Sequence, residues 1–368
     1  MSAQDQDPLT YQRSGVDTAA AGEALARLTR HVKQTLSFRD DAPVGRPLRG
    51  VGYYANVIDM GGGMGLALSM DGVGTKLIVA ELLGKYDTVG IDCIAMNVND
   101  LICVGADPVA MLDYVALGRV DADVLDQLGR GLLEGCRRCR ITIPGGELAQ
   151  VGEMLRGEGA TRGLDIVGTA VGVVPLDRVL FGQQVTPGDV VVGISSSGLH
   201  SNGFTLARKV LAPSRADYER HEPAFERTIG EELLEPTALY VELARDLLSS
   251  GLAVHAICHI TGDGFVNLSR VEAPVGFELD ALPEPQPVFQ VIEERGGIPK
   301  AEMYSVFNMG VGLCVVLPEK DASAAMEAAS RHAFDAWIIG RVTAEEGVVR
   351  LPAFDLESRG GSELRIRS

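Results

Sequence analysis

The sequence predicts an α/β protein of two domains, and three observations lead to this prediction. The chain has 368 residues, enough for roughly two domains that each bury their own core. Hydrophobic residues make up 46% of the chain and glycines number 44, a composition typical of glycine-rich α/β enzymes rather than of disordered or fibrous proteins. Stretches with the periodicity of strands alternate with stretches of helical periodicity along most of the sequence.

The first half begins with a predicted helix that runs from an N-cap at Asp17 to about Leu36, because apolar residues recur there at helical spacing. Prolines, glycines and charged residues predict a loop over 37–50. Beyond the loop, strands are predicted near 51–58, 66–70, 109–117 and 164–174. Helices are predicted near 76–84, 88–104 and 121–139.

The second half repeats the alternation. Its strands are predicted near 189–194, 254–259, 275–279, 311–317 and 336–342, and its helices near 203–211, 232–249, 286–295 and 320–332. Pro175 and the turn-forming segment 186–189 place the domain boundary around 174–187. We therefore expect domains at 1–174 and 175–368, with a polar tail from Ser358.

Charge and cysteine usage narrow the class of partner. With 33 basic against 50 acidic residues, the net charge of −17 disfavours binding to nucleic acid or to an anionic membrane. Neither a secretory signal nor an apolar run long enough to cross a bilayer is visible. Six scattered cysteines predict reduced, buried thiols in a cytoplasmic protein. Cys136 and Cys139 form a CxxC pair, but they end a predicted helix and have no second pair for zinc, which favours a structural role.

A glycine-rich loop at 71–76, with the sequence DGVGTK, directly follows a short apolar run. Its glycines allow close approach of the backbone to a ligand, and its amides, Thr75 and Lys76 can face phosphate oxygens. Asp71 adds a carboxylate beside these groups. A carboxylate next to a phosphate loop indicates a divalent cation, because Mg²⁺ binds carboxylates together with phosphate oxygens.

The predicted helix at 88–104 carries polar residues among aliphatic ones. Asp92 and Asn99 are seven residues apart and therefore share a face, and Asp100 lies one step round the helix. These groups could be caps or solvent-facing residues. The helix is apolar over most of its circumference, however, so its carboxylates would be at least half buried and would need a cation or a hydrogen-bonding partner.

A third carboxylate, Glu147, follows Gly145 and Gly146 at the end of a short apolar run. Taken alone, this segment is equally typical of a Gly-Gly turn with an exposed glutamate. As a carboxylate at a strand end, Glu147 could complete a metal shell with Asp71 and Asp100.

Two loops in the second half have the form of anion sites. The segment 194–203, ISSSGLHSNG, lies between a predicted strand and a predicted helix start, where free amides and the positive end of the helix dipole favour anions. His200 is its titratable group and could act as a general acid or base, although a solvated surface histidine is the alternative. The segment 259–265, HITGDGF, has a similar strand–loop–helix pattern, in which Asp263 would repel a phosphate unless it contacts a hydroxyl or a metal.

Taken together, these motifs resemble those of the phosphoribosylformylglycinamidine cyclo-ligase family, also called aminoimidazole ribonucleotide synthetases. The resemblance covers nearly the whole chain, at 11–17, 71–76, 90–101, 145–147, 196–203, 236–240, 259–265 and 303–312. Altered loops at 49–55, 147–152 and 261–264 resemble a divergent branch of that family. The resemblance implies two domains with mixed sheets flanked by helices, and a homodimer in which the N-terminal sheets close a barrel.

The resemblance also implies an activity. Members close formylglycinamidine ribonucleotide to 5-aminoimidazole ribonucleotide with ATP and Mg²⁺, in de novo purine biosynthesis. The alternatives are another ATP-dependent kinase or activator of the same superfamily, or a non-catalytic nucleotide-binding homologue.

Roles for individual residues follow from the resemblance. The implied Mg²⁺ ligands are Asp71, Asp100 and Glu147, and the implied catalytic residues are His200, Asp71 and Asp100. The residues implied to bind ATP are Gly72, Gly74, Thr75, Lys76, Asp92, Asn97, Asn99 and Gly146. The residues implied to bind the substrate are Ser196, Ser197, Gly198, Asn202, Gly203, Thr261 and Gly262.

Overall fold

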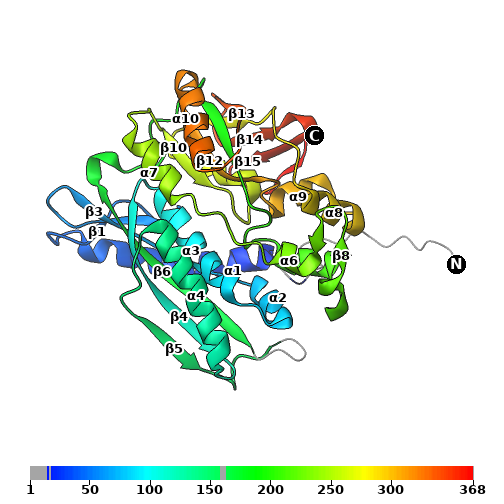
Figure 1. Ribbon diagram of the computed structural model, residues 1–368. Helices are drawn as coiled ribbons and strands as arrows, with labels where there is room; N and C mark the ends of the chain where they lie inside the picture. The colour runs from blue at the N-terminus through cyan, green and yellow to red at the C-terminus, as the bar shows by residue number, and fades with distance from the viewer. Residues whose placement is uncertain (1–14, 16–17, 158–162, 368) are drawn as a thin grey trace.

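Two sheets, one from each half of the chain, form the framework of the protein (Figure 1). The structure is a computed structural model that describes residue 15, residues 18–157 and residues 163–367. The predicted N-cap at Asp17 therefore lies outside the described residues. Within this part of the chain, a six-stranded sheet comes from the first half and an eight-stranded sheet from the second.

The sheet of the first half has the order β1-β2-β3-β6-β4-β5. Its strands are β1 (Arg46–Pro47), β2 (Asn56–Asp59), β3 (Met64–Gly72), β4 (Asp107–Leu117), β5 (Gly146–Gln150) and β6 (Leu164–Pro175). Neighbours pair antiparallel except β4 and β5, which are parallel and are joined by a helical crossover. The helices are α1 (Thr18–Val32), α2 (Lys76–Leu83), α3 (Asp87–Ile102) and α4 (Ala122–Cys139), with a 3₁₀ helix at Lys33–Arg39.

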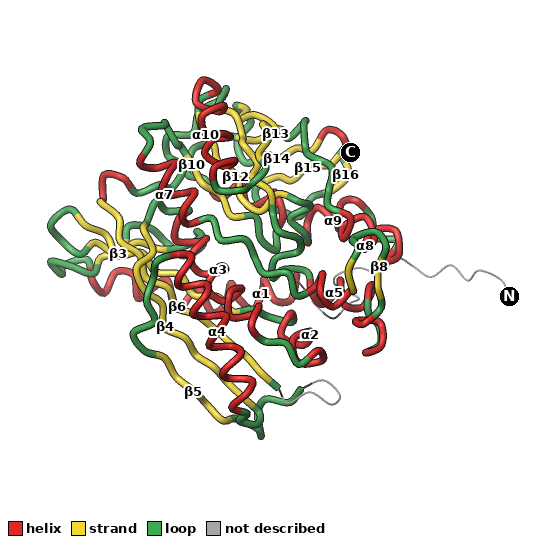
Figure 2. The backbone as a smooth tube through the Cα atoms, viewed as in Figure 1, coloured by secondary structure: helices red, strands yellow, loops and turns green. Residues whose placement is uncertain are grey.

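Helices α3 and α4 cover one face of this sheet, as Figure 2 shows. Strand residues alternate between the two faces, so buried residues of β6 alternate with part-buried or exposed ones along its length. On the face away from the helices, large apolar side chains remain exposed, and Met70 is 71% exposed. Other exposed members of this open face are Met64, Leu112, Tyr114 and Val173.

The sheet of the second half has the order β10-β12-β7-β13-β11-β14-β15-β16. Its strands are β7 (Val190–Ser195), β10 (Ala256–His259), β11 (Gly276–Glu278), β12 (Val311–Leu317), β13 (Ala336–Thr343), β14 (Val348–Leu351), β15 (Leu356–Arg359) and β16 (Arg365–Ile366). A separate small hairpin joins β8 (His221–Glu222) and β9 (Arg227–Thr228). Every residue of β12 is buried, as expected for a strand inside a covered sheet.

Helices surround this second sheet. They are α5 (Phe204–Leu211), α6 (Ile229–Leu233), α7 (Val241–Ser249), α8 (Pro287–Gly296), α9 (Lys300–Val306) and α10 (Glu319–Arg331). Short 3₁₀ helices occur at Leu176–Arg178, Arg215–Glu219, Gly264–Arg270 and Pro352–Phe354. Helix α10 packs on β7 and β13, while the 3₁₀ helix Gly264–Arg270 contacts β10, β11 and β14.

The structure corrects several predicted elements. The helix predicted over 232–249 is two helices, because Pro236 interrupts the segment between α6 and α7. The Gly-Gly turn continues directly into the edge strand β5. The polar tail from Ser358 contains the end of β15 and all of β16, and α9 was not predicted. HITGDGF leads into a 3₁₀ helix rather than an α-helix.

Helices α3 and α4 approach one another closely through glycines. A Cβ atom on Gly131 would lie 2.1 Å from the carbonyl oxygen of Asp87, and one on Gly90 would lie 2.5 Å from the amide nitrogen of Leu132. The two backbones can approach this closely only because neither position carries a side chain. This contact holds α3, and therefore its polar residues, against the sheet.

Candidate active site

The starts of two helices from the two halves of the chain meet at one place. Helix α2 follows Gly74 (φ 70°) and Thr75, and helix α5 follows Gly203 (φ 73°). Thr75 Oγ1 lies 3.1 Å from Thr205 Oγ1 in the first turn of α5. Helix starts carry unpaired amides and the positive end of the helix dipole, so this junction favours an anion such as phosphate.

Asp71 lies at the end of β3, directly before this junction. Asn97 of α3 fixes its backbone, since the Asp71 amide donates to Asn97 Oδ1 (2.9 Å) and Asn97 Nδ2 donates to the Asp71 carbonyl (3.1 Å). Burial raises the pKa of the Asp71 carboxyl to about 6; the Gly72 amide opposes this change and the charge of Asp100 adds to it. A carboxylate that is costly to ionise alone would be stabilised by a bound cation.

Asp100 is the second carboxylate at this place. Its Oδ1 lies 2.9 Å from Nδ1 of His259, which ends strand β10 of the second half and is 1% exposed. His259 thus joins the acidic pair to the second sheet. Sequence reasoning did not assign His259 a role, although its position at the end of a predicted strand, directly before the Thr-Gly loop, was the available signal.

The structure does not bring Glu147 to the other two carboxylates within one chain. Asp71 and Gly146 lie on one row across the sheet, three strands apart, or about 14 Å at the usual strand spacing. Glu147 is the next residue of β5, so it points to the opposite face. In the ranges that the structure describes, no group of three His, Cys, Asp or Glu residues could hold a metal ion. Within one chain, Glu147 and Gly146 therefore lie apart from Asp71, and the predicted three-carboxylate shell stays a prediction.

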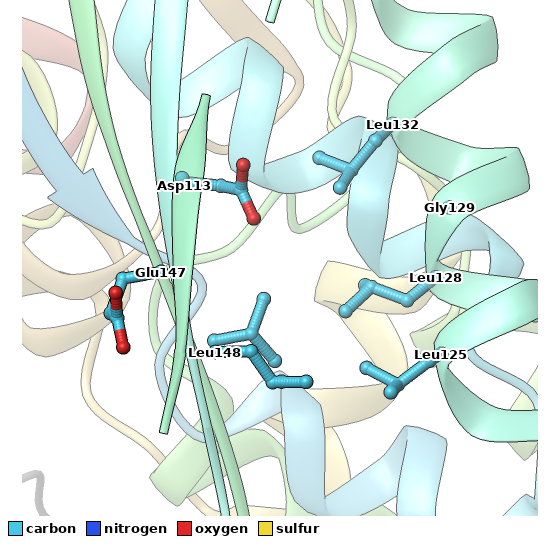
Figure 3. A pocket seen from close by; sticks show the side chains of 9 residues that line it. Asp113, Leu125, Leu128, Gly129, Leu132, Glu147 and Leu148 are labelled. Atoms are coloured by element: carbon cyan, nitrogen blue, oxygen red, sulfur yellow. The ribbon is translucent and has the colours of Figure 1, made fainter. Parts of the chain in front are cut away.

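The edge strand β5 lies beside a pocket that it lines together with α4, which Figure 3 shows. Asp113 points into a pocket of about 340 Å³ beneath α4, while Glu147 points away from it. The other labelled side chains are leucines, at 125, 128, 132 and 148. Burial raises the pKa of Asp113 in this apolar setting.

Lys76 does not face the phosphate junction. Its side chain is fully buried, and Nζ donates to Asp92 Oδ1 (2.9 Å), the His200 carbonyl (3.0 Å) and the Glu235 carbonyl (2.6 Å). Three donors are all that an ammonium has. The predicted contact between Lys76 and phosphate is therefore not available in this structure.

Asp92 and Asn99 share a face of α3, as the sequence predicts, but that face contacts protein. Asp92 Oδ1 accepts hydrogen bonds from the amide and hydroxyl of Thr237, at 2.7 and 2.6 Å. Asn99 donates to the Ala238 carbonyl (2.8 Å) and accepts from the Tyr240 amide (3.1 Å). Both side chains are fully buried and contact protein in this structure, and their contact with ATP stays a prediction. They fasten the first half to segment 237–240 of the second.

His200 is buried as well, at 1% exposed. Its Nε2 accepts a hydrogen bond from the Ser197 amide (3.3 Å), and burial, followed by His259 and Lys76, lowers its pKa well below the ordinary value. The other ring nitrogen, Nδ1, is buried and has no hydrogen-bond partner among the described residues. The general acid–base role of His200 stays a prediction, and in this structure the imidazole is enclosed by protein.

The hydroxyls of the loop at 196–203 are largely used to shape the loop itself. Ser196 Oγ donates to Asn308 Oδ1 (2.9 Å) and Ser197 Oγ to the Pro236 carbonyl (2.6 Å), while the Gly198 carbonyl accepts from Asn308 Nδ2 (2.8 Å). Their predicted contacts with substrate would have to come from backbone atoms.

The two predicted substrate loops meet at Asn202, because a Cβ atom on Gly262 would lie 3.5 Å from its Oδ1. In the same second loop, Thr261 Oγ1 is 3.5 Å from Asn267 Oδ1. Asp263 forms an ion pair with Arg270 at 3.1 Å, which reduces its repulsion of an anionic ligand.

A cavity of about 340 Å³ opens beside the start of α2. It lies between that helix and the segments 155–157 and 163–165. Its lining includes Gly74, Thr75, Ile78, Arg156 and Asp165. The cavity therefore combines a helix start, an apolar wall, the cation of Arg156 and the carboxylates of Glu81 and Asp165.

The six cysteines, including the CxxC pair at the end of α4, are buried and free. None of the described helices combines the length and the apolar character needed to cross a bilayer.

Comparison with known proteins defines the class first. Residues 52–174 match the N-terminal domain of AIR synthase related proteins, and residues 186–351 match the C-terminal domain of the same proteins. A thiamine monophosphate kinase from Aquifex aeolicus has the same fold, with a TM-score of 0.60 and 19% identity over 88% of this chain and 94% of that one. The hydrogenase maturation protein HypE in complex with ATP shares the fold at a TM-score of 0.55 and 18% identity, over 82% of this chain and 84% of that one.

Curated relatives are more specific. The phosphoribosylformylglycinamidine cyclo-ligase of Methanothermobacter thermautotrophicus is 43% identical over 94% of this chain and 97% of its own length. The cyclo-ligase of Thermococcus kodakarensis is also 43% identical, over 92% of this chain and 97% of its own length. The chain belongs to the phosphoribosylformylglycinamidine cyclo-ligase family.

Proposed function

We propose that this enzyme closes formylglycinamidine ribonucleotide to 5-aminoimidazole ribonucleotide, with conversion of ATP to ADP and phosphate, in de novo purine biosynthesis. Identity of 43% to named cyclo-ligases over nearly the whole chain supports the activity. The observation that carries the proposal is the meeting of the starts of α2 and α5 beside Asp71. This junction offers phosphate-binding amides from both halves next to an acidic pair.

The chemistry needs positioning more than a strong acid or base. The formamide oxygen takes the γ-phosphoryl group of ATP, which releases ADP and turns a poor leaving group into a good one. The amidine nitrogen then bonds to the formyl carbon, and the C–O bond breaks with loss of phosphate. Holding the γ-phosphoryl group in line with the amide oxygen, and stabilising its charge, supplies most of the acceleration in such transfers.

Residues of the first half are assigned to ATP and residues of the second half to the substrate. We assign the amides of Gly74 and Thr75 to the ATP phosphates and place the nucleotide along the cavity between Gly74 and Arg156. The Gly72 amide donates to Asp71 Oδ1 (2.7 Å) and so holds the carboxylate instead. The loop ending at Gly203 and the Thr261–Gly262 turn face it from the second half and are assigned to the phosphorylated substrate. Domains at 1–174 and 175–368 would thus bind nucleotide and substrate respectively.

Asp71 and Asp100 suit Mg²⁺ as a pair. Both offer hard oxygen ligands, and the charge of Asp100 contributes to the raised pKa of Asp71, so a cation between them would relieve their repulsion. A bound Mg²⁺ would neutralise charge on the transferred phosphoryl group. Its remaining ligands would be phosphate oxygens and water, as is usual for this ion.

The proposed activity is tested by incubating the protein with formylglycinamidine ribonucleotide, ATP and Mg²⁺, and measuring ADP together with the aminoimidazole. We expect equal amounts of both products, and at least a hundredfold loss of both in Asp100→Ala. Asp126→Asn, which changes an exposed carboxylate on α4, is the matched control and should keep full activity. ADP without aminoimidazole would favour a kinase of the same fold, and neither product a non-catalytic homologue.

We also propose that two copies associate through the open face of the six-stranded sheet, so that their sheets close a barrel across a two-fold axis. The exposed apolar side chains at Met70, Leu112 and Tyr114 support this assembly, because a monomer would leave them in water. The assembly belongs in the cytoplasm, where the six free thiols stay reduced.

The dimer is tested by light scattering on variants of exposed leucines. Leu112→Asp places a charge on the open face and should give a monomer. Leu133→Asp places the same charge on α4, where the side chain is 70% exposed, and should leave the mass unchanged. A dimeric Leu112→Asp protein would remove this face from the interface.

A further inference from the structure

Lys76 and its partner Asp92 form a completely buried ion pair that contacts both halves of the chain. Lys76 is the last residue of the DGVGTK loop and the first of α2, and its side chain is 0% exposed. Its three donors reach Asp92 in the first half and the carbonyls of His200 and Glu235 in the second. The ring of Phe204, the first residue of α5, lies beneath the ammonium at 5.4 Å.

The segments that Lys76 contacts are also fastened to one another. Ser197 Oγ donates to the Pro236 carbonyl (2.6 Å), and Ser201 Oγ lies 3.1 Å from Thr237 Oγ1. Thr237 in turn donates twice to Asp92. The loop at 196–203, the segment 235–240 and helix α3 therefore converge on one buried ion pair.

We propose that Lys76 is a positioning residue and not a phosphate ligand. Together with Asp92, it sets the place of the loop at 196–203, and so the start of α5, opposite the start of α2. The inference rests on the proposed function, because the two helix starts are the groups assigned there to the phosphates of ATP and substrate.

The contacts exclude a simple exchange of partners on ligand binding. To reach a phosphate, Lys76 would have to leave two carbonyls and its carboxylate partner, and Asp92 would become a buried charge that only Thr237 contacts. Removing one partner of a buried ion pair is strongly unfavourable, because the remaining charge is uncompensated. The junction beside Thr75 already offers amides to phosphates without this cost.

The two roles of Lys76 predict different results for Lys76→Met. A positioning role predicts an ATP dissociation constant within about threefold of wild type, a turnover number lower by roughly a hundredfold, and faster hydrogen exchange of amides in 196–204 and 235–240. A phosphate ligand would instead weaken ATP binding by about 10- to 100-fold and leave exchange in 235–240 unchanged. That second result would overturn the proposal.

A variant in the other half gives an independent test. Thr237→Val removes the hydroxyl that donates to Asp92 but keeps the shape of the side chain. It should lower turnover by about tenfold without changing ATP affinity, and combining it with Lys76→Met should add little, because both break one network. Independent, additive losses would contradict the proposal. Lys85→Met, two residues beyond the end of α2 and exposed, is the matched control and should resemble wild type.

Two further choices keep the test decisive. If Lys76→Met does not fold, Lys76→Met/Asp92→Leu removes both charges together and should fold, since neutral replacement of a buried pair is tolerated better than loss of one partner. Hydrogen exchange needs no turnover, so it tests the network even if the wild-type protein fails to form aminoimidazole. That failure would refute the proposed function alone.

Discussion

Replacing Asp71 by Asn is expected to abolish ring closure and, without Mg²⁺, to stabilise the protein above about pH 6. The carboxyl has a pKa of about 6 in the fold against 3.8 ordinarily, mainly because it is buried. A raised acid pKa means that the folded state binds the proton more tightly, so stability falls as pH rises from 4 to 6 and stays low above it. Asparagine does not ionise, so the variant does not lose this stability. Because the Asp71 side chain is partly exposed, the loss in the wild type is limited to about 1–2 kcal/mol.

Urea unfolding of both proteins from pH 4 to pH 8, with and without Mg²⁺, would measure this effect. The difference in unfolding free energy should be small at pH 4 and reach its plateau near pH 7. Mg²⁺ should stabilise the wild type and not Asp71→Asn, which reverses the order at saturating metal. If Asp71→Asn is less stable than wild type at pH 8 without metal, burial does not destabilise the ionised Asp71 carboxylate in the wild type.

Gly131→Ala is expected to destabilise the protein by about 2 kcal/mol or more, although alanine is the better helix former. Helix propensity alone favours alanine by about 1 kcal/mol in the middle of α4. The added Cβ would lie 2.1 Å from the Asp87 carbonyl oxygen, so α3 and α4 would have to separate, and overpacking of this kind outweighs the propensity.

The same helix offers a matched control, two residues earlier. A Cβ on Gly129 would have no atom within 4 Å, so Gly129→Ala should stabilise by roughly 0.5–1 kcal/mol. Urea unfolding of both variants separates packing from propensity. Equal effects of the two substitutions would mean that the helix crossing is not closely packed.

Most elements could be predicted from the sequence because their signals are local. The period of the apolar residues in α4 and α10 and the glycine-rich loops before α2 and α5 lie within a few residues of the structures they specify. The strands β5 and β16 escaped prediction because they are short edge strands, largely exposed and without an apolar pattern. The strands β1, β8, β9, β14 and β15, each of two to four residues, were not predicted either. Their pairing partners, rather than their own residues, decide their structure.

The candidate site was predicted less completely, because its composition depends on contacts between distant segments. Asp92 and Asn99 do share a face of α3, yet their partners lie about 140 residues later, at 237–240. Glu147 ends a short apolar run as Asp71 does, but the order β3-β6-β4-β5 separates them. No local pattern contains the order of strands or the contacts between halves. The charge of Asp100 does contribute to the raised pKa of Asp71, and the role of the two carboxylates as metal ligands stays a prediction.

Because every cysteine is buried, the rate at which each thiol reacts reports how often the protein around it opens. Four of the thiols lie in the first half, and Cys258 and Cys314 face one another across β10 and β12 in the second. Burial raises the pKa of the Cys139 and Cys258 thiols to about 12. Neither Cys139 nor Cys258 therefore reacts with an alkylating reagent until the protein around it opens. Native-state alkylation rates at these two thiols would therefore compare the opening of each half. Equal rates would show that the contacts around Lys76 make the two halves open as one unit.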